Sequence, residues 1–115
     1  MDGDRITVFL ADDNTLVREG VKALLSIEKD IEVVGTAEDY DGLVEGATAA
    51  HPQVVVSDIR MPPNFQDEGI VGAKEVRKRH PGTGIVILSQ YDDPDYAIAL
   101  LEEAALDGVP AIIID

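Results

Sequence analysis

The chain has 115 residues, no cysteine, and 23 acidic against 9 basic residues, which gives a formal net charge of -14 at pH 7. This length fits one domain, the hydrophobic fraction of 45% excludes a disordered acidic chain, and the lack of cysteine excludes disulfides and thiolate metal sites. No apolar run approaches the roughly 20 residues of a membrane span, no signal-peptide pattern is present, and the acidity argues against direct nucleic-acid binding, so we expect a cytoplasmic protein without membrane contact.

Five short apolar runs, rich in β-branched residues, predict buried strands. Segments with apolar residues at helical spacing separate the runs, beginning with Leu16, Val21 and Leu24. Because strands and helices alternate, we expect a doubly wound α/β fold, with a flavodoxin-like parallel sheet of strand order 2-1-3-4-5 and helices on both faces. The predicted strands are Ile6–Ala11, Ile31–Val34, Val54–Val56, Ile85–Leu88 and Ala111–Ile114.

Both histidines fall at predicted helix ends. His51 and His80 each precede a proline, which stops a helix, so we expect them at the C-termini of the second and third helices. A positively charged imidazole there interacts favourably with the helix dipole. We therefore interpret both as structural or exposed residues rather than as phosphohistidines or metal ligands. The other boundary signals are Asn14 and Thr15 as caps of the first helix, Asp41 near the start of the second, and Pro94 in the first turn of the fourth.

Three acidic residues follow two of the predicted strands. Asp12 and Asp13 come directly after Ile6–Ala11, and Asp58 follows the run at Val54–Val56. In the expected strand order these two strands are neighbours, and their carboxyl ends lie at the switch point of the sheet, where ligands bind. Three carboxylates gathered there repel one another unless a divalent cation or a phosphoryl group offsets their charge.

Magnesium is a cation that suits such a group of hard oxygen ligands. We expect Asp13 and Asp58 to bind Mg2+ directly, together with the backbone carbonyl of Arg60, and Asp12 to bind it through water. A carboxylate that shares a metal with an incoming phosphoryl group is also a competent nucleophile. Asp58 is the best candidate because it stands alone at its strand end. The sequence therefore predicts a magnesium-dependent phosphoryl acceptor.

Two further features are expected beside the three aspartates. Ser89 follows the fourth strand at the same edge of the sheet, where its hydroxyl can donate a hydrogen bond to a phosphoryl group on Asp58. The irregular connection Met61–Gly69, with Asp67 and Glu68 ahead of the third helix, borders the site. Taken singly, paired acids also act as helix caps and a serine after a strand is often a turn residue. Their convergence at one edge favours a functional site.

The motifs that carry these residues resemble the receiver domain of two-component response regulators. They are ADDN with Asp12 and Asp13, SDIRMPP with Asp58, and ILSQY with Ser89, and the resemblance covers the whole chain. The RMPP and LSQY sequences are similar to the LuxR/NarL-type subgroup, whose output domain is a helix-turn-helix DNA binder. The resemblance implies that a sensor histidine kinase phosphorylates Asp58 to regulate an output, that Asp12 and Asp13 hold Mg2+, and that Ser89 moves toward the phosphoryl group.

The fifth predicted strand departs from the family pattern at two positions. The family carries a lysine there that pairs with the phosphoryl group, whereas this chain reads AIIID and has Ile114 at the lysine position. Ala111 stands at the position of the family's aromatic switch residue. Loss of a charged hydrogen bond worth about 1.5–3 kcal/mol is expected to weaken phosphorylation and to uncouple it from the output. No lysine follows Lys78, so a shift of strand register does not restore one.

The resemblance also sets an expectation for the end of the chain. The family continues into a fifth helix, which this chain lacks, so we expect residues 1–115 to be a C-terminally truncated receiver domain that contacts DNA only through an absent output domain. An apolar sheet face beside Ile112 or Ile113 would then be uncovered, and such faces usually find a partner. A homodimer is the expected outcome, with a disordered or removed continuation as the alternative.

Three functions stay open on the sequence. The first is a phosphoacceptor receiver domain of a transcriptional response regulator, with no enzymatic activity beyond self-phosphorylation and autodephosphorylation at Asp58. The second is a degenerate receiver that acts as a phosphorylation-independent interaction or dimerisation module, which Ile114 and Ala111 favour. The third, a small magnesium-dependent phosphohydrolase, is disfavoured because residues 59–63 read IRMPP and offer no second carboxylate for acid catalysis.

Overall fold

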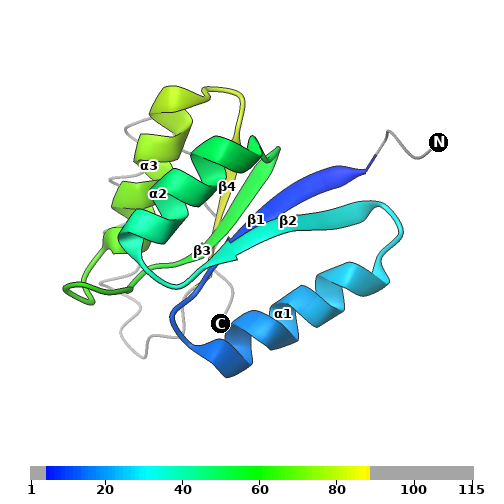
Figure 1. Ribbon diagram of the computed structural model, residues 1–115, viewed down its shortest axis with the longest axis horizontal. Coiled ribbons are helices and arrows are strands. Elements are labelled where there is room, and N and C mark those ends of the chain that lie inside the picture. Colours follow the sequence, from blue (N-terminus) through cyan, green and yellow to red (C-terminus); the bar gives the residue numbers. More distant parts are fainter. Residues whose placement is uncertain (1–4, 89–115) are drawn as a thin grey trace.

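Strands and helices alternate along the described part of the chain, as the sequence predicts (Figure 1). The computed structural model describes residues 5–88. The predicted strand Ala111–Ile114 and the helix expected at Pro94 therefore lie outside the described residues. The elements are β1 (Ile6–Ala11), α1 (Thr15–Ile27), β2 (Ile31–Ala37), α2 (Tyr40–Ala50), β3 (Val54–Asp58), α3 (Glu68–Arg79) and β4 (Gly84–Leu88).

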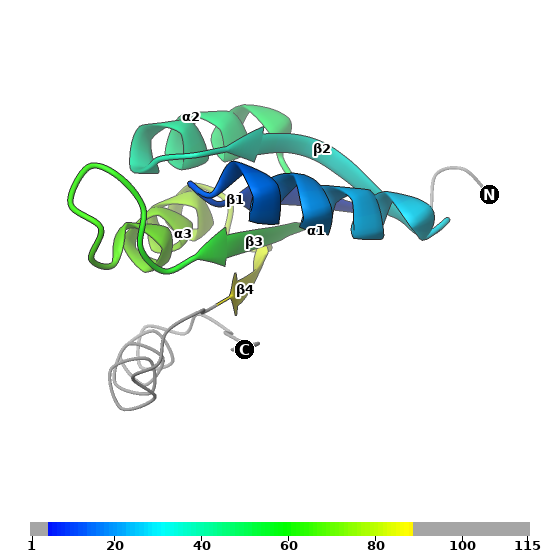
Figure 2. The same cartoon turned by 90° about the horizontal axis from the view of Figure 1, so that it is seen from below.

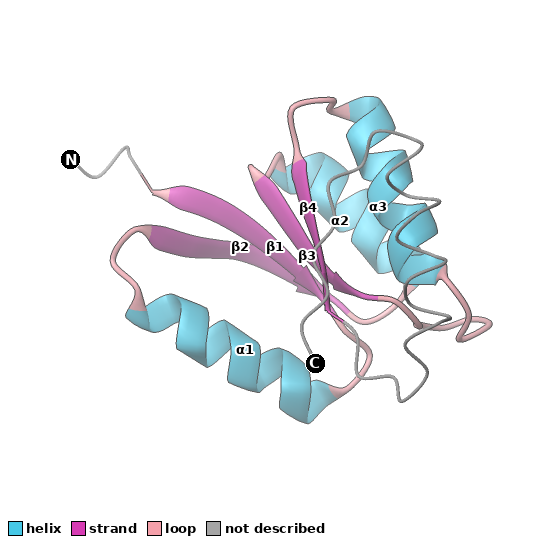
Figure 3. Ribbon diagram, turned by 180° about the vertical axis from the view of Figure 1, so that it is seen from behind, coloured by secondary structure: helices cyan, strands magenta, loops and turns pink. Residues whose placement is uncertain are grey.

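The strands form one parallel sheet in the order β2-β1-β3-β4 (Figure 3). This confirms the predicted order for the four described strands. The chain turns in opposite directions on the two sides of β1, so the boundary between β1 and β3 is the switch point of the sheet. Ala11 pairs with Ser57 there, which brings the residues that follow β1 beside the last residue of β3.

Helices cover both faces of the sheet, with α1 on one face and α2 and α3 on the other (Figures 1 and 2). The main core lies under α2 and α3, where the buried side chains include Leu43, Val55 and Val76. In contrast, α1 has no fully buried residue. Leu16 and Leu24, which the helical spacing assigns to one apolar face, are 84% and 67% exposed. Within residues 5–88, no helix has the length and apolar character needed to cross a membrane.

The ring of Phe9 shapes the contact between the sheet and α2. Phe9 is only 2% exposed, and a Cβ atom added at Gly35 in β2 or at Gly46 in α2 would come within 2.8 and 2.7 Å of the ring. Glycine is therefore required on both sides of this side chain by close packing. The close approach holds α2 against the half of the sheet that contains β1 and β2.

The predicted start of α1 and the predicted ends of α2 and α3 agree with the structure. The side chain of Asn14 caps α1 by accepting a hydrogen bond from the Val17 N–H at 3.1 Å. Asp39 caps α2 through the Gly42 N–H, and Asp41 lies in the first turn, where its charge suits the helix dipole. His51 and His80 are the residues at which α2 and α3 end, as predicted, and His51 has the left-handed conformation with φ 52°.

Candidate metal centre

Three carboxylates meet at the carboxyl ends of β1 and β3. One carboxylate oxygen from each of Asp12, Asp13 and Asp58 lies within 4.8 Å of the others. Asp12 is 2% exposed, whereas Asp13 and Asp58 are half-buried. The structure thus brings together the three aspartates that the sequence singles out, and it does so because their strands are neighbours in the sheet.

Contacts from the β1–α1 loop, from the end of β2 and from α1 hold Asp12 in place. Its side chain accepts a hydrogen bond from the Asn14 N–H at 2.9 Å, and its own N–H donates to the Ala37 carbonyl at 3.0 Å. The guanidinium of Arg18 donates to the Asp12 carbonyl at 2.8 Å and lies 3.9 Å from Glu38. Sequence reasoning missed Arg18, because a basic residue in the first turns of a helix carries no pattern that assigns it to the preceding loop.

Asp58 is held from the other side by the start of the connection to α3. One of its side-chain oxygens, Oδ1, accepts a hydrogen bond from the Ile59 N–H at 2.8 Å, and its carbonyl accepts from the Ser57 hydroxyl at 2.9 Å. Gly69 lies directly against this carbonyl, and a Cβ added at Gly69 would overlap the Asp58 carbonyl oxygen. The Gly69 N–H also donates to the Ile59 carbonyl at 2.9 Å. The first turn of α3 therefore packs directly against the end of β3, which carries Asp58.

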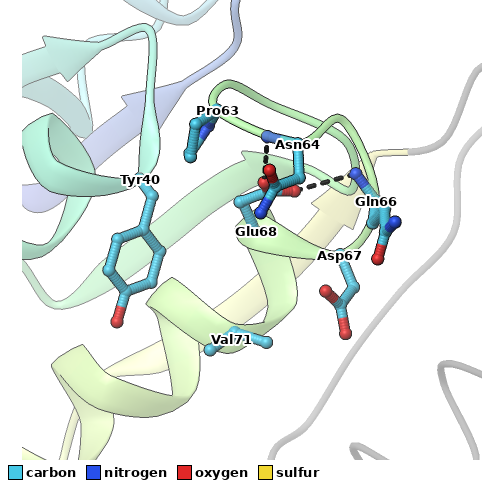
Figure 4. Close-up of a pocket in the computed structure, with 7 residues that line it drawn as sticks. All are labelled: Tyr40, Pro63, Asn64, Gln66, Asp67, Glu68 and Val71. Carbon is cyan, nitrogen blue, oxygen red and sulfur yellow. Dashed lines mark hydrogen bonds between the residues drawn. The ribbon is translucent and has the colours of Figure 1, made fainter.

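Glu68 organises the loop beside the aspartates (Figure 4). This residue begins α3, whereas the sequence analysis placed it ahead of the helix. Its buried carboxylate accepts hydrogen bonds from the N–H groups of Asn64 and Gln66, at 2.6 and 2.8 Å. Burial acts to raise the pKa of Glu68, but these N–H donors outweigh it and hold the pKa below its usual value. The charged Glu68 carboxylate thus supplies hydrogen-bond acceptors for two backbone N–H groups of this irregular loop.

The same loop forms an open cavity of about 250 Å3 with the start of α2. Figure 4 shows Tyr40 on one side of this cavity, Pro63 and the loop that carries Asn64 and Gln66 on the other side, and Val71 of α3 below. The Tyr40 N–H donates to the Pro62 carbonyl at 3.2 Å, which ties α2 to the loop. The loop that borders the three aspartates, predicted from Met61 to Gly69, is therefore ordered by contacts to both neighbouring helices.

The carboxylates perturb one another strongly. Burial, and then the charges of Asp12 and Asp13, raise the pKa of Asp58 to about 7, against the opposing effect of the Ile59 N–H. Burial also raises the pKa of Asp12; the Asn14 N–H opposes this, and the charge of Asp13 adds to it. With this pKa, Asp58 is only partly ionised at neutral pH in the protein alone. A cation bound beside the three carboxylates would favour their ionised forms.

The residues present fit a magnesium ion. All three side chains offer hard carboxylate oxygens, and these converge within the span of one small cation. Burial, together with the neighbouring carboxylates, raises the pKa of Asp12 and of Asp58, so a cation here would favour their ionised forms. Arg60, whose carbonyl the sequence analysis adds to this set, follows in the same loop and is half-buried. Ser89, Ala111 and Ile114 lie outside the described residues, so the roles assigned to them stay predictions.

The chain matches a model of a known protein family over most of its length. Residues 8–110 match the response regulator receiver domain. The chain is 33% identical over 102 residues to the transcriptional regulatory protein DegU of Brevibacillus brevis, covering 89% of this chain and 42% of DegU. It is also 33% identical over 98 residues to the oxygen regulatory protein NreC of Staphylococcus haemolyticus, covering 85% of this chain and 44% of NreC. The chain thus spans less than half the length of these relatives.

Solved structures show the same fold. The signal receiver domain of NarL from Mycobacterium tuberculosis superposes with a TM-score of 0.79 and 31% sequence identity, over 96% of this chain and 83% of that one. The response regulator domain of CheB from Thermotoga maritima gives a TM-score of 0.79 with 32% identity, over 96% and 77%. Both similarities extend over the sheet and helices that position the three aspartates.

Proposed function

Because the chain belongs to the response regulator receiver domain family of two-component systems, we propose that it accepts a phosphoryl group on Asp58 from a sensor histidine kinase. The family is regulatory rather than catalytic, and the relatives of this chain include transcription regulators. The observation that carries the proposal is the convergence of three carboxylates, with the pKa of Asp58 raised to about 7, at the switch point of the sheet. We propose one receiver domain over residues 1–115.

Receiver domains generally bind Mg2+ at an acidic pocket, and we assign its ligands to Asp12, Asp13 and Asp58, with the carbonyl of Arg60. Bound there, the ion supplies charge neutralisation for the carboxylates and for the incoming phosphoryl group. Asp12 is fixed by the Asn14 N–H and is buried, whereas Asp13 is half-buried. We keep the assignment made from the sequence, in which Asp13 and Asp58 bind the ion directly and Asp12 binds it through water.

The transfer itself uses the side chain of Asp58. The Ile59 N–H holds Oδ1, and we assign the attack on phosphorus to the other oxygen, Oδ2. The new bond forms between that oxygen and phosphorus while the P–N bond of the phosphorylated kinase histidine breaks; the departing imidazole nitrogen keeps the electron pair and takes up a proton from water. The attacking carboxylate must be ionised, and its raised pKa explains why the reaction would need the cation.

The second candidate is a degenerate receiver that works as an interaction module without phosphorylation. The sequence favours it at Ile114 and Ala111, where the family's lysine and aromatic switch residue are replaced. The complete set of aspartates supports the first candidate. In either case we propose that a homodimer forms and that DNA is contacted by a segment other than this acidic chain. The cytoplasmic location expected from the sequence stays a prediction.

A small phosphodonor separates the two candidates without knowledge of the kinase. The chain is incubated with acetyl phosphate and Mg2+, and the intact mass is measured for the wild type and for Asp58→Ala. A phosphoacceptor gains one phosphoryl group in the wild type and none in the variant. No gain at any Mg2+ concentration would favour the interaction module, and sustained release of inorganic phosphate with turnover would favour the phosphohydrolase.

A further inference from the structure

The two histidines of the described chain meet at the end of the sheet where β3 and β4 begin, opposite the aspartates. His51 ends α2 and His80 ends α3, and β3 and β4 begin shortly after them (Figure 1). The centres of the two imidazole rings lie 3.9 Å apart, with the ring planes inclined at 51°. Residues 29 positions apart in the sequence are thus in direct contact, which no local pattern predicts.

One of the two imidazoles has an unsatisfied polar atom. The Nε2 atom of His80 is enclosed and has no hydrogen-bond partner among the described residues. Burying a polar nitrogen without a partner is unfavourable, so such an atom points to a missing ligand or to a feature that needs explanation. His51 is exposed, and both histidines line the same open cavity of about 370 Å3. The pair is therefore accessible from solvent through His51.

The other polar side chains around this cavity already have partners. Gln53 accepts a hydrogen bond from the Thr7 N–H at 3.0 Å, and the Thr83 hydroxyl donates to the Pro52 carbonyl at 3.3 Å. Arg79 carries the one charge on the lining that would repel a cation. Its guanidinium donates to the carboxylate of Glu75 at 3.0 Å, which offsets much of that charge. The imidazoles are the groups left to bind a ligand.

We propose that His51 and His80 form a binding site for one divalent transition-metal ion of the class that prefers imidazole, with Zn2+ as the test ion. Two imidazole nitrogens bound to Zn2+ at about 2.0–2.1 Å place their ring centres roughly 5 Å apart, so the observed contact needs a small opening of the rings. The carbonyl ends of α2 and α3 both lie at this place, and the negative ends of two helix dipoles favour a cation. Water molecules complete the coordination.

The proposed site differs in chemistry from the three aspartates. Imidazole suits Zn2+, Cu2+ and Ni2+, whereas an all-carboxylate set suits Mg2+. Binding at the histidines would join the C-terminal ends of α2 and α3, which otherwise meet through side-chain packing. A metal that binds only the folded chain raises its stability. The chain would then bind a transition metal at the end of the sheet where β3 and β4 begin, and accept a phosphoryl group at the opposite end.

Zn2+ titration of the full chain without an affinity tag tests the proposal. Saturating Mg2+ is kept present so that the carboxylates are occupied, and binding is followed by calorimetry and by the NMR signals of the imidazole rings. We expect one Zn2+ per chain, simultaneous shifts of the His51 and His80 signals, and a higher thermal midpoint. His51→Asn should weaken binding roughly tenfold or more, since one of two ligands is lost. Asparagine is chosen because it tolerates the left-handed backbone at residue 51.

Two variants make the result specific. His80→Gln should weaken binding in the same way; if it fails to fold, the exposed position 51 still decides the question. Asp13→Asn, which alters the carboxylate site, should leave the Zn2+ affinity at the histidines unchanged. The proposal is overturned if Zn2+ binds with equal affinity to wild type and His51→Asn, if Asp13→Asn abolishes binding, or if no Zn2+ binds.

Discussion

Burial and the neighbouring carboxylates favour the neutral form of the Asp58 side chain. Its pKa of about 7 in the folded chain lies well above the roughly 3.9 of an unfolded aspartate. The folded state therefore holds a proton on Asp58 between about pH 4 and pH 7 that the unfolded state has released. The stability linked to this group is fully present below about pH 4 and is lost as the pH rises through about 7, in the absence of a metal.

Replacing Asp58 by asparagine tests this effect. With a chelator present, Asp58→Asn should be more stable than the wild type at pH 8 by about 1–3 kcal/mol, less than the full equivalent of the shift because the site opens to solvent. The two proteins should converge near pH 4. Urea unfolding at both pH values measures the difference, and added Mg2+ should close the gap at pH 8. Equal stability at pH 8 without metal would show that burial and the neighbouring carboxylates do not disfavour the ionised form of Asp58.

Gly69 offers a second test of how Asp58 is positioned. A Cβ at this residue would overlap the Asp58 carbonyl, so Gly69→Ala should destabilise the chain by about 1–3 kcal/mol and impair phosphorylation. Gly20→Ala is the matched control, because Gly20 lies inside α1 with nothing within 4 Å of an added Cβ. This control should stabilise the chain by about 0.5–1 kcal/mol. Two substitutions of equal effect would contradict the close approach of α3 to β3.

The sequence predicts some residues of the site and not others, for a physical reason. Asp12, Asp13 and Asp58 are predictable because each follows an apolar strand, and the alternation of elements makes those strands neighbours. Arg18 and Glu68 bind backbone groups of loops, namely the Asp12 carbonyl and two N–H groups of the β3–α3 connection. Such partners depend on the path of the loop, which has no periodic pattern in the sequence.

At the scale of the elements, the connection from β3 to α3 depends on one buried carboxylate. The pKa of Glu68 is lowered, so its contribution to stability is present above the pKa of an unfolded glutamate and is lost as the pH falls through the lower folded value. A glutamine at this position keeps one acceptor oxygen, but its NH2 group faces the second N–H donor. The loop beside Asp58 should therefore lose order when the charge is removed.

Glu68→Gln should destabilise the chain by about 1–3 kcal/mol at pH 7, since a charged hydrogen-bond acceptor is lost. The difference should shrink in the acid range, where wild-type Glu68 is itself protonated. Glu75→Gln is the control, because the Glu75–Arg79 pair lies on the surface of α3 and is worth about 0.3–0.5 kcal/mol. Urea unfolding at pH 7 and at low pH measures both. A Glu68→Gln effect no larger than that of the control would exclude the organising role.

Sequence patterns predict the ends of helices but not the contacts that the helices make. The proline after each histidine predicts that α2 and α3 end at His51 and His80, and the structure agrees. The contact between those histidines depends on how the two helices pack on the sheet, and hence on side chains far from either residue. Similarly, the spacing in α1 indicates an apolar face that includes Leu16 and Leu24, yet both are exposed. Periodicity identifies a helix and its apolar side, but not what covers that side.

For the whole molecule, exposed apolar side chains and high negative charge act in opposite directions. Leu16, Leu24 and Ile27 of α1 are 84%, 67% and 74% exposed, and exposed apolar side chains favour association. The net charge of -14 opposes it, since two copies repel each other. The proposed homodimer should therefore strengthen as salt screens the charge. The apolar face expected beside Ile112 or Ile113 lies outside the described residues.

Light scattering over a wide range of protein and salt concentrations tests the homodimer. Leu24→Glu should shift the chain toward monomer by removing an apolar contact. Ala23→Glu adds the same charge to an exposed neighbouring position of α1 and serves as the control, with a smaller effect. A wild-type chain that stays monomeric at every concentration, in low and high salt, would contradict the proposal.

Asp58 is proposed to accept a phosphoryl group within a magnesium site. The most direct measurement treats the chain with acetyl phosphate, with and without Mg2+, and locates the added group by fragment mass spectrometry. Wild type and Asp41→Asn, which removes an exposed carboxylate in the first turn of α2, should both carry one phosphoryl group on Asp58, and only when Mg2+ is present. Asp58→Asn should carry none. A phosphoryl group found on another residue, or on Asp58 without Mg2+, or on none in the wild type would contradict the account.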